Sequence, residues 1–326
     1  MKRRIVTMML LAVLILPGVV AAQAEVVWVR EYDPTLSEFP EGLAVDLHGN
    51  IYVSMAVLGE VRRISPDGAE TLFYRFPPVA AVQLLGLTVD ALGNIYVCVF
   101  SPYAPDYQGV WRIDRRGGAE HLPGTEAIGL PNALAFDPQG NLYVTDSWVP
   151  GTASPEGSVW RIPRGGEAEV WYQDGENLGG LGQIPGYPPL GANGIAYYQR
   201  ALFVANTERG HIVRIPILPH GGPGEPVVMW DDDALMMVDG ITMNHVGSIF
   251  AAVIGYDRIV AICGFTGALS VLVAGPPIDG PASVAMGPHN DSLDTLYFTN
   301  YAVLNTEQPQ PGVLKVVLGW PPWIQH

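Results

Sequence analysis

Four side chains with oxygen ligands, Glu41, Asn132, Asn193 and Asp239, stand at matching points of a pattern that recurs along the chain. If they were brought together, two carboxylates and two amide carbonyls would form an all-oxygen set with two negative charges. Such a set suits Ca²⁺, a hard cation that prefers carboxylate, carbonyl and water oxygens. Zinc and copper are disfavoured, because no histidine or cysteine occupies these points. Whether the four residues can act together depends on the elements that carry them.

The recurring pattern is an alternating apolar segment, a turn with Gly and Asn, and a second apolar segment, as in NALAFDPQGNLYVTD. Three copies are clear and three are fainter. The six copies begin at Glu41, Leu85, Asn132, Asn193, Asp239 and Ala282. Their spacing is 43 to 47 residues, apart from one interval of 61. An internal repeat of this length has to be explained before any other feature of the fold.

Two further strand-like segments follow each of the first five copies, for example SVWRI and then EVWYQ. Period-2 alternation, turn residues and the lack of helical periodicity predict four antiparallel strands per unit. Four strands in 40 to 50 residues are typical of a β-propeller blade. The sequence therefore predicts an all-β, six-bladed propeller, formed as one domain by residues 25–326.

The two ends of the chain complement each other. The sixth unit has a third strand, GVLKVVLG, but no fourth, whereas the segment Val26–Tyr32 resembles the fourth strands of other units. We expect this N-terminal segment to supply the missing outer strand of the last blade. That arrangement closes the ring and pairs an edge that would otherwise be open.

The first strand of each blade lines the channel of a propeller, so the six starting residues would form a ring at its mouth. Leu85 and Ala282 are the two apolar members. Asn-Gly and Asp-Gly are also common turn dipeptides, so Asn193 and Asp239 could simply open strands, and Glu41 and Asn132 could cap loops. Converging carboxylates and amides would be costly without a cation between them. The pattern therefore favours a calcium site.

Long irregular loops follow the second strands and reach the same face as the ring, with a further connection at 173–192. Such loops on a rigid scaffold commonly build binding sites. Asp146 and Asn206 stand just after second strands, where they could hydrogen-bond loop backbone or contact a substrate. Trp148 and the pair Tyr103 and Tyr107 could form a wall of the pocket.

The ring order Glu, Asn, Asn, Asp on blades one, three, four and five resembles the gluconolactonase/senescence-marker-protein family of six-bladed propellers, which is related to paraoxonase and diisopropyl-fluorophosphatase. The resemblance covers the whole chain after residue 24. It implies that Glu41, Asn132, Asn193 and Asp239 hold a catalytic calcium. In the gluconolactonase branch, the residue matching Asn132 mainly contacts substrate.

Departures from this family concern the substrate rather than the metal. Leu130 stands where gluconolactonases carry an arginine, and Gly240 follows Asp239 where paraoxonases have an asparagine. No paraoxonase-like histidine pair is evident. We expect His48, His245 and His289 in turns on the far face. His121 and His211 are expected in or beside outer strands.

The chain begins with a leader-like segment. MKRR, an apolar run from Ile5 to Val20 and the sequence AQA predict a signal peptide cleaved after about Ala24, with an uncleaved anchor as the alternative. Without Lys2, Arg3 and Arg4, 14 basic residues face 32 acidic ones. That acidity disfavours nucleic acid and anionic membranes and suits cations. The protein would then be secreted or periplasmic.

Three functional hypotheses follow. The first is an exported Ca²⁺-dependent hydrolase of a lactone or related ester, with Asp239 as general base or nucleophile. The second is a non-enzymatic, NHL-like propeller that binds a ligand or protein and uses calcium for structure. The third, a lyase or synthase on the same fold, is disfavoured by the ring residues. Substrate, oligomeric state and the pairing of Cys98 with Cys263 stay open, and fold alone does not decide function.

Overall fold

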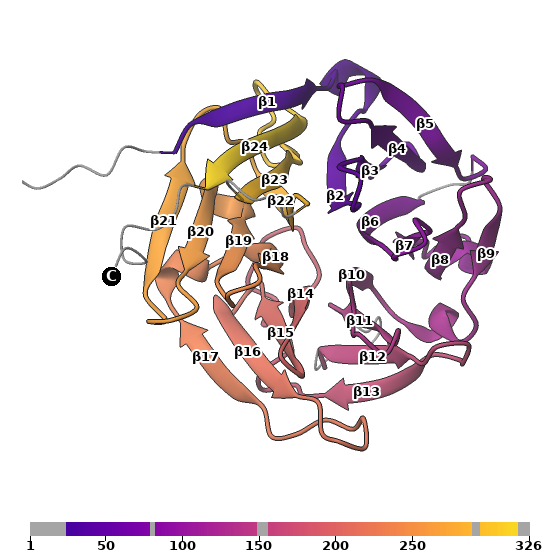
Figure 1. The fold of residues 1–326 in the computed structure, drawn as a ribbon, viewed down its shortest axis with the longest axis vertical. Coiled ribbons are helices and arrows are strands. Elements are labelled where there is room, and N and C mark those ends of the chain that lie inside the picture. Colours follow the sequence, from indigo (N-terminus) through magenta and orange to yellow (C-terminus); the bar gives the residue numbers. More distant parts are fainter. Residues whose placement is uncertain (1–23, 79–81, 149–155, 289–293, 319–326) are drawn as a thin grey trace, which may run out of the picture.

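The computed structural model describes residues 24–78, 82–148, 156–288 and 294–318. Six four-stranded antiparallel sheets form a closed ring, so the predicted six-bladed β-propeller is confirmed (Figure 1). The predicted signal peptide lies outside the described residues, apart from Ala24. In the described part of the chain, no helix is both long and apolar enough to span a bilayer.

Blades one to five each contain four consecutive strands, ordered from the axis outward. Blade one has β2 (Pro40–Val45), β3 (Ile51–Met55), β4 (Glu60–Ile64) and β5 (Glu70–Arg75). Blade two has β6 (Gln83–Val89), β7 (Ile95–Phe100), β8 (Gly109–Ile113) and β9 (Ala119–His121). Blade three has β10 (Pro131–Phe136), β11 (Leu142–Asp146), β12 (Ser158–Ile162) and β13 (Glu169–Gln173).

Blade four has β14 (Ala192–Tyr198), β15 (Ala201–Asn206), β16 (His211–Pro216) and β17 (Val227–Asp231). Blade five has β18 (Val238–Met243), β19 (Ile249–Val253), β20 (Arg258–Ile262) and β21 (Leu269–Ala274). Blade six has β22 (Pro281–Met286), β23 (Asp294–Asn300) and β24 (Gly312–Leu318). Short 3-10 turns are η1 (Pro34–Leu36), η2 (Pro105–Tyr107), η3 (Thr125–Ala127), η4 (Asp233–Leu235) and η5 (Ile254–Tyr256).

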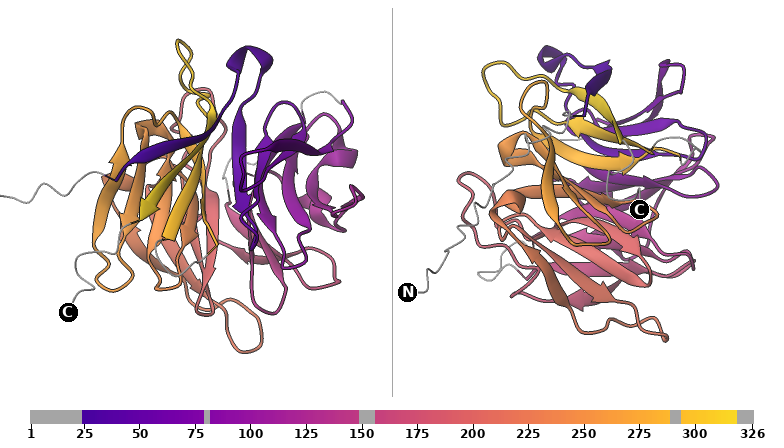
Figure 2. Two further views of the ribbon diagram at one scale, coloured as in Figure 1. Left: turned by 45° about the horizontal axis from the view of Figure 1, so that its top comes forward. Right: turned by 60° about the vertical axis from the view of Figure 1, so that its left-hand side comes forward.

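The N-terminal strand β1 (Val26–Glu31) completes blade six, as the sequence predicted. It pairs antiparallel with β24, from Val26 opposite Val316 to Glu31 opposite Gly312. The two segments come from opposite ends of the chain and lie side by side (Figure 2). Because β1 covers the outer edge of β24, the last blade has the same four-stranded form as the others.

The hydrophobic core consists of layers between neighbouring blades. Six clusters of buried apolar side chains each join two adjacent blades, and one of them packs Val97 of blade two against Val61 of blade one. Both faces of an inner strand therefore contact apolar neighbours. Burial of this kind is worth roughly 25 cal/mol per Å² of apolar surface, and it fixes the blades that carry the ring.

The clearest part of the sequence repeat is structural. In blade three, the Asp137 carboxylate accepts hydrogen bonds from the Asn141 backbone (2.9 Å), the Asn141 side chain (2.7 Å) and the Tyr143 hydroxyl (3.3 Å). The same turn recurs at Asp46 and Asp90. These turns connect the first two strands of a blade at the face opposite the ring, so the most repetitive residues hold the scaffold.

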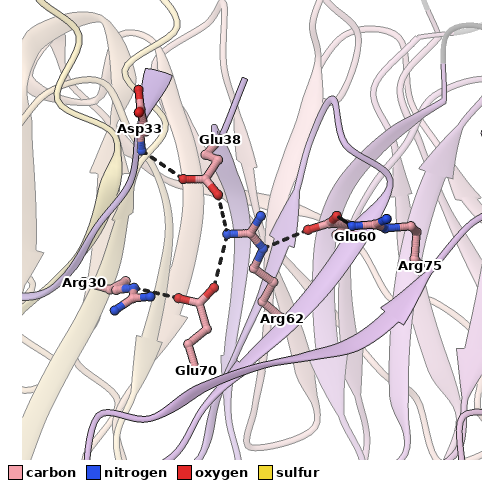
Figure 3. Close-up of polar contacts among 7 residues, drawn as sticks. All are labelled: Arg30, Asp33, Glu38, Glu60, Arg62, Glu70 and Arg75. Atoms are coloured by element: carbon pink, nitrogen blue, oxygen red, sulfur yellow. Dashed lines mark hydrogen bonds and ion pairs between the residues drawn. The ribbon is translucent and has the colours of Figure 1, made fainter. Parts of the chain in front are cut away.

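A charged cluster joins the N-terminal strand to blade one (Figure 3). Arg62 on β4 contacts Glu38 (2.8 Å), Glu60 (2.8 Å) and Glu70 (3.2 Å). Arg30 on β1 contacts Glu70 from the other side at 2.7 Å. The Arg62 side chain is 15% exposed and its three partners are at most 18% exposed. This cluster, here called the latch, therefore holds the N-terminal strand β1 against blade one, where the first and last blades of the propeller meet.

Removing the Arg62 guanidinium at the centre of the latch should destabilise the closed propeller. We expect Arg62→Met to destabilise the protein by about 2–4 kcal/mol, because three largely buried carboxylates lose their shared partner. The measurement is the midpoint of urea unfolding. The control is Arg112→Met, whose partner Glu120 is 58% exposed and whose ion pair should contribute less than about 1 kcal/mol. Equal losses in the two variants would contradict a role for the latch in closure.

Candidate metal centre and cavity

Every inner strand is irregular at its ring residue. In blade three, Pro131 pairs with Asp146 but the next pair is Leu134 with Val144, so Asn132 lies in the irregular stretch. The other five blades shift register at the same place. A bulge redirects a side chain that would otherwise follow the alternation of the strand. This shared irregularity is how an alternating strand presents a polar residue to the axis.

The residue after the ring position is small for reasons of packing. A Cβ on Gly86 would lie 2.5 Å from the carbonyl oxygen of Asn132 in the next blade, and one on Gly240 would lie 2.6 Å from that of Ala282. Gly194 faces the carbonyl of Asp239 in the same way. The Asn-Gly and Asp-Gly dipeptides therefore do not form turns. They allow neighbouring inner strands to approach closely at the ring.

Hydroxyl groups fix the backbone of several ring residues. Thr299 of blade six donates to the carbonyl of Glu41 (2.8 Å), and Thr145 of blade three donates to that of Asn193 (2.6 Å). Ser54 of blade one donates likewise to Leu85 (2.7 Å). Each bond links one blade to the ring residue of the next. The ring is therefore held rigidly relative to the blades.

A cavity of about 200 Å³ brings the predicted quartet together. Glu41, Asn132, Asn193 and Asp239 all line it, and all four are buried. Leu85 lines it too, whereas Ala282 is not among the lining residues. Most of the other wall is apolar: Phe100, Leu130, Ile184, Pro188, Leu190, Met237, Ile254, Val303 and Leu304. Gln83, Tyr187, Thr207 and Tyr301 add polar groups. A second cavity of about 310 Å³ is lined by the inner strands and contains no ionisable side chain except that of Tyr197.

Two oxygens of the quartet are buried without a hydrogen-bond partner, Glu41 Oε2 and Asn193 Oδ1. The Asn193 amide nitrogen donates to Thr207 (2.9 Å), and that of Asn132 donates to Ser147 (3.0 Å). The amide nitrogens are thus engaged by hydroxyls, which leaves the carbonyl oxygens for another partner. Buried polar atoms are rarely left unsatisfied, so these oxygens fit a bound cation.

The donor set matches a hard cation rather than a transition metal. Among the described residues, no three His, Cys, Asp or Glu side chains cluster as a metal site. The ring instead offers two carboxylates and two amides, which are ligands for calcium. The donor atoms of the ring therefore fit a calcium ion.

The two carboxyl groups of the ring are destabilised as anions. Burial raises the pKa of Asp239 from 3.8 to about 7, and a hydrogen bond from Asn193 offsets part of this effect. Burial and the charge of Asp239 raise the pKa of Glu41 well above its usual range. Burial and the charges of both carboxylates also raise the pKa of the Tyr301 phenol. A divalent cation would remove the cost of holding two negative charges in this place.

The raised pKa values predict how the metal-free protein responds to pH. A carboxyl whose pKa is higher in the folded state stabilises the fold below its unfolded pKa near 4, and this contribution is lost as pH rises through about 7. We therefore expect the protein in chelator to lose on the order of 2–4 kcal/mol between pH 5 and pH 8. The measurement is urea unfolding across this range.

The control for this pH dependence is the double variant Glu41→Gln/Asp239→Asn. Burial lowers the pKa of His211. This histidine therefore destabilises the fold as pH falls below its unfolded pKa, which is opposite to the effect of the two carboxyl groups. Because His211 is unchanged in the double variant, its contribution is the same in both proteins. The difference between the two proteins therefore isolates the ring. A difference that does not vary with pH would contradict buried, mutually repelling carboxylates.

Three other predicted site residues do not line the cavity. The Asp146 carboxylate accepts from the backbone N–H groups of Gly129 (3.0 Å) and Leu130 (2.8 Å). The Asn206 amide donates to the carbonyls of Asn177 (3.0 Å) and Gly179 (3.1 Å). Trp148 is half-buried and is not among the lining residues. Asp146 and Asn206 thus use their side chains to hold loop backbone. Substrate contact by Asp146, Asn206 or Trp148 stays a prediction.

The remaining aromatic and titratable candidates lie away from the cavity wall. Tyr103 is 80% exposed, and Tyr107 stacks on Trp111. His121 also stacks on Trp111, and His211 hydrogen-bonds the Asn177 carbonyl. Cys98 is a free, buried thiol, so no disulfide joins it to Cys263.

Several cavity residues were not predicted from the sequence. Thr207, Ile254 and Tyr301 each stand one position after a second strand, in the same column of the repeat as Ser147. Their shared position in the repeat is the signal that identifies them. Ile184 and Tyr187 come from a loop with no counterpart in other blades, so no alignment within the chain could indicate them.

Comparison with known proteins supports the fold. No protein-family model matches the sequence, and no curated protein sequence matches it. A gluconolactonase from Xanthomonas campestris has 17% identity over 91% of this chain and 90% of its own, with a TM-score of 0.67. Regucalcin from Agrobacterium tumefaciens, described as a calcium-binding protein, has 16% identity over 91% and 96%, with a TM-score of 0.64.

A virginiamycin B lyase from Staphylococcus aureus is also similar, with 17% identity over 85% of this chain and 82% of its own, but its TM-score is lower at 0.55. The resemblance to gluconolactonase-like propellers that the ring order indicated is therefore confirmed by solved structures. At these identities, what the chain shares with them is the six-bladed propeller fold.

Proposed function

We propose that the protein is an exported hydrolase of a lactone or related ester and that it depends on a calcium ion at the ring. One observation carries this proposal: buried oxygens of Glu41 and Asn193 lack partners beside Asp239, in a cavity at the face of the long loops. A scaffold propeller has no need of such costly groups. The gluconolactonase and regucalcin structures of the same fold add support.

Glu41, Asn132, Asn193 and Asp239 would hold the ion. When bound, calcium supplies a Lewis acid that polarises an ester carbonyl and stabilises negative charge on its oxygen. The hydroxyl bonds from Thr145 and Thr299 keep the ring backbone fixed. The ligand oxygens are therefore positioned before a substrate arrives, which is the arrangement that lowers reorganisation cost.

Asp239 is proposed as the residue that starts the reaction. Its carboxylate either takes a proton from a water that attacks the acyl carbon, or attacks that carbon itself. In the first route the acyl carbon bonds to the water oxygen, the ester bond breaks, and the alkoxide takes up the proton held by Asp239. In the second route the alkoxide leaves and takes up a proton, and water then hydrolyses the acyl-aspartate anhydride, which releases the acid and restores the carboxylate. Tyr301 lines the same cavity, and burial raises the pKa of its phenol further above neutral pH, so the hydroxyl keeps its proton. It can therefore donate a hydrogen bond to the substrate.

The apolar wall limits the access of water to the reacting bond. Because electrostatic interactions strengthen where water is excluded, the ring acts more strongly on a bound ester than it would at an open surface. A neutral substrate also suits a site with no Arg, Lys or His among its lining residues.

The test is hydrolysis of a panel of sugar lactones, alkyl lactones and aryl esters by the protein without residues 1–24. Each substrate is assayed with millimolar Ca²⁺ and then with a chelator. We expect turnover that stops with chelator and returns with calcium. Calcium that raises the melting temperature while no substrate turns over would instead favour the binding propeller.

A further inference from the structure

We propose that the cavity selects substrates with an apolar alkyl or aryl substituent and excludes polyhydroxylated ones, and that the segment 181–190 above the ring, here called the cap, carries this selectivity. The inference rests on the proposed function, since it names the substrate class of that same site. It comes from the residues that face the ring, their burial and the bonds that hold the cap.

Most of the cavity wall beyond the quartet is apolar. The cap supplies Ile184, Tyr187, Pro188 and Leu190. Strands and loops of blades two, three, five and six supply the remaining apolar surface, whose members are Leu85, Phe100, Leu130, Met237, Ile254, Val303 and Leu304. A substituent placed beyond the reacting bond would therefore contact mainly hydrocarbon.

Polar side chains are a minority of this wall. Of those lining the cavity beyond the quartet, Thr207 already accepts a hydrogen bond from Asn193, at 2.9 Å. Gln83, Tyr187 and Tyr301 are the other polar groups of the wall. A sugar lactone has several hydroxyls, and each one that is buried without a partner opposes binding. The wall thus penalises such a substrate rather than merely failing to attract it.

The cap is fastened to blade four and does not need the substrate to order it. The buried Glu208 carboxylate accepts from the backbone N–H groups of Leu181, Gly182 (2.6 Å) and Gln183 (3.2 Å). Asn206 and Arg209 both donate to the Gly179 carbonyl just before the cap. These bonds come from one short segment of blade four. They present the apolar side chains of the cap in a fixed arrangement, which favours discrimination by shape and polarity.

The same cavity sets an expected size for the substituent. A volume of about 200 Å³ is below the usual range for drug-sized ligands, so selectivity should rise with chain length and then stop. Burying one methylene changes kcat/KM by about three- to fourfold. We therefore expect kcat/KM to rise from δ-valerolactone to δ-octalactone and to level off or fall with longer chains.

The experiment compares this lactone series with glucono-δ-lactone, at saturating calcium, in the wild-type protein and in Ile184→Asn. In parallel, calorimetry measures the affinity of cyclohexanones that bear the same alkyl chains and cannot be hydrolysed. We expect the wild type to prefer δ-octalactone to the sugar lactone by at least about tenfold in kcat/KM. In Ile184→Asn, the gain per methylene should fall by about half in both assays, with δ-valerolactone little changed.

Leu92→Asn is the matched control, because Leu92 is 72% exposed in a turn on the far face; its chain-length dependence should equal that of the wild type. A sugar lactone preferred over alkyl lactones would overturn the inference while leaving the proposed function intact. Affinity for cyclohexanones that does not rise with chain length, or that Ile184→Asn leaves unaltered, would also overturn it. Rising affinity without turnover of any ester would defeat the proposed hydrolysis but support the apolar cavity.

Discussion

Asp239→Asn is expected to lower kcat by about 10³-fold while the protein stays folded, since general-base or nucleophilic catalysis contributes on this scale. Asparagine keeps the shape of the side chain and one carbonyl oxygen, so the cavity is preserved. It removes the negative charge and the ability to accept a proton. The change therefore acts on the chemistry more than on the architecture.

The assay has to separate a lost base from a lost metal. Turnover is measured at calcium concentrations that saturate the variant, as judged by its own thermal shift. Asp90→Asn is the control, because that carboxylate binds backbone in a turn on the far face and its loss should leave kcat within about twofold. Turnover of calcium-saturated Asp239→Asn within tenfold of wild type would show that another group starts the reaction.

Glu41→Gln is expected to be more stable than wild type without metal and to lose most or all of that advantage when calcium is added. In chelator at pH 8, the variant should be more stable than wild type by about 1–3 kcal/mol, because it removes a buried charge that lies near a like charge. With calcium at 100 times its dissociation constant, wild type gains about 2.7 kcal/mol. The variant, which has one charged ligand fewer, should gain little.

The measurement is urea unfolding in the two conditions, with Asp137→Asn as the comparison. Asp137 is buried to nearly the same degree as Glu41, but its carboxylate accepts several hydrogen bonds. Its substitution should cost stability equally with and without calcium. If Glu41→Gln destabilised the metal-free protein, or if it kept the calcium response of the wild type, the ring would not be a cation site.

The fold was predictable because the blades repeat the same strand pattern and, in three of them, the same hydrogen-bonded turn. The turn that Asp137 builds with Asn141 and Tyr143 recurs twice more, so the strands around it align by eye. The same alignment placed the ring, because the bulge occurs at one position in every inner strand. The closing strand was predictable from the missing fourth strand of the last unit.

The cavity wall was harder to predict, since it comes from segments that do not repeat. The cap exists in one blade only, and its position depends on bonds from Glu208 and Asn206 that no pattern in the sequence indicates. Asp146 and Asn206 share a column whose members hold loops, a role that Asn300 repeats in blade six. A position just after a second strand therefore does not by itself place a side chain in the cavity.

A catalytic calcium is tested most directly by a single calcium titration in which hydrolysis of δ-octalactone and calcium binding by calorimetry are followed on the same sample. We expect one calcium per chain and a rate that rises with the same dissociation constant as the binding isotherm. Ring variants should lose both responses together. Hydrolysis that persists in chelator, or calcium binding that saturates without any change in rate, would contradict a catalytic calcium at this ring.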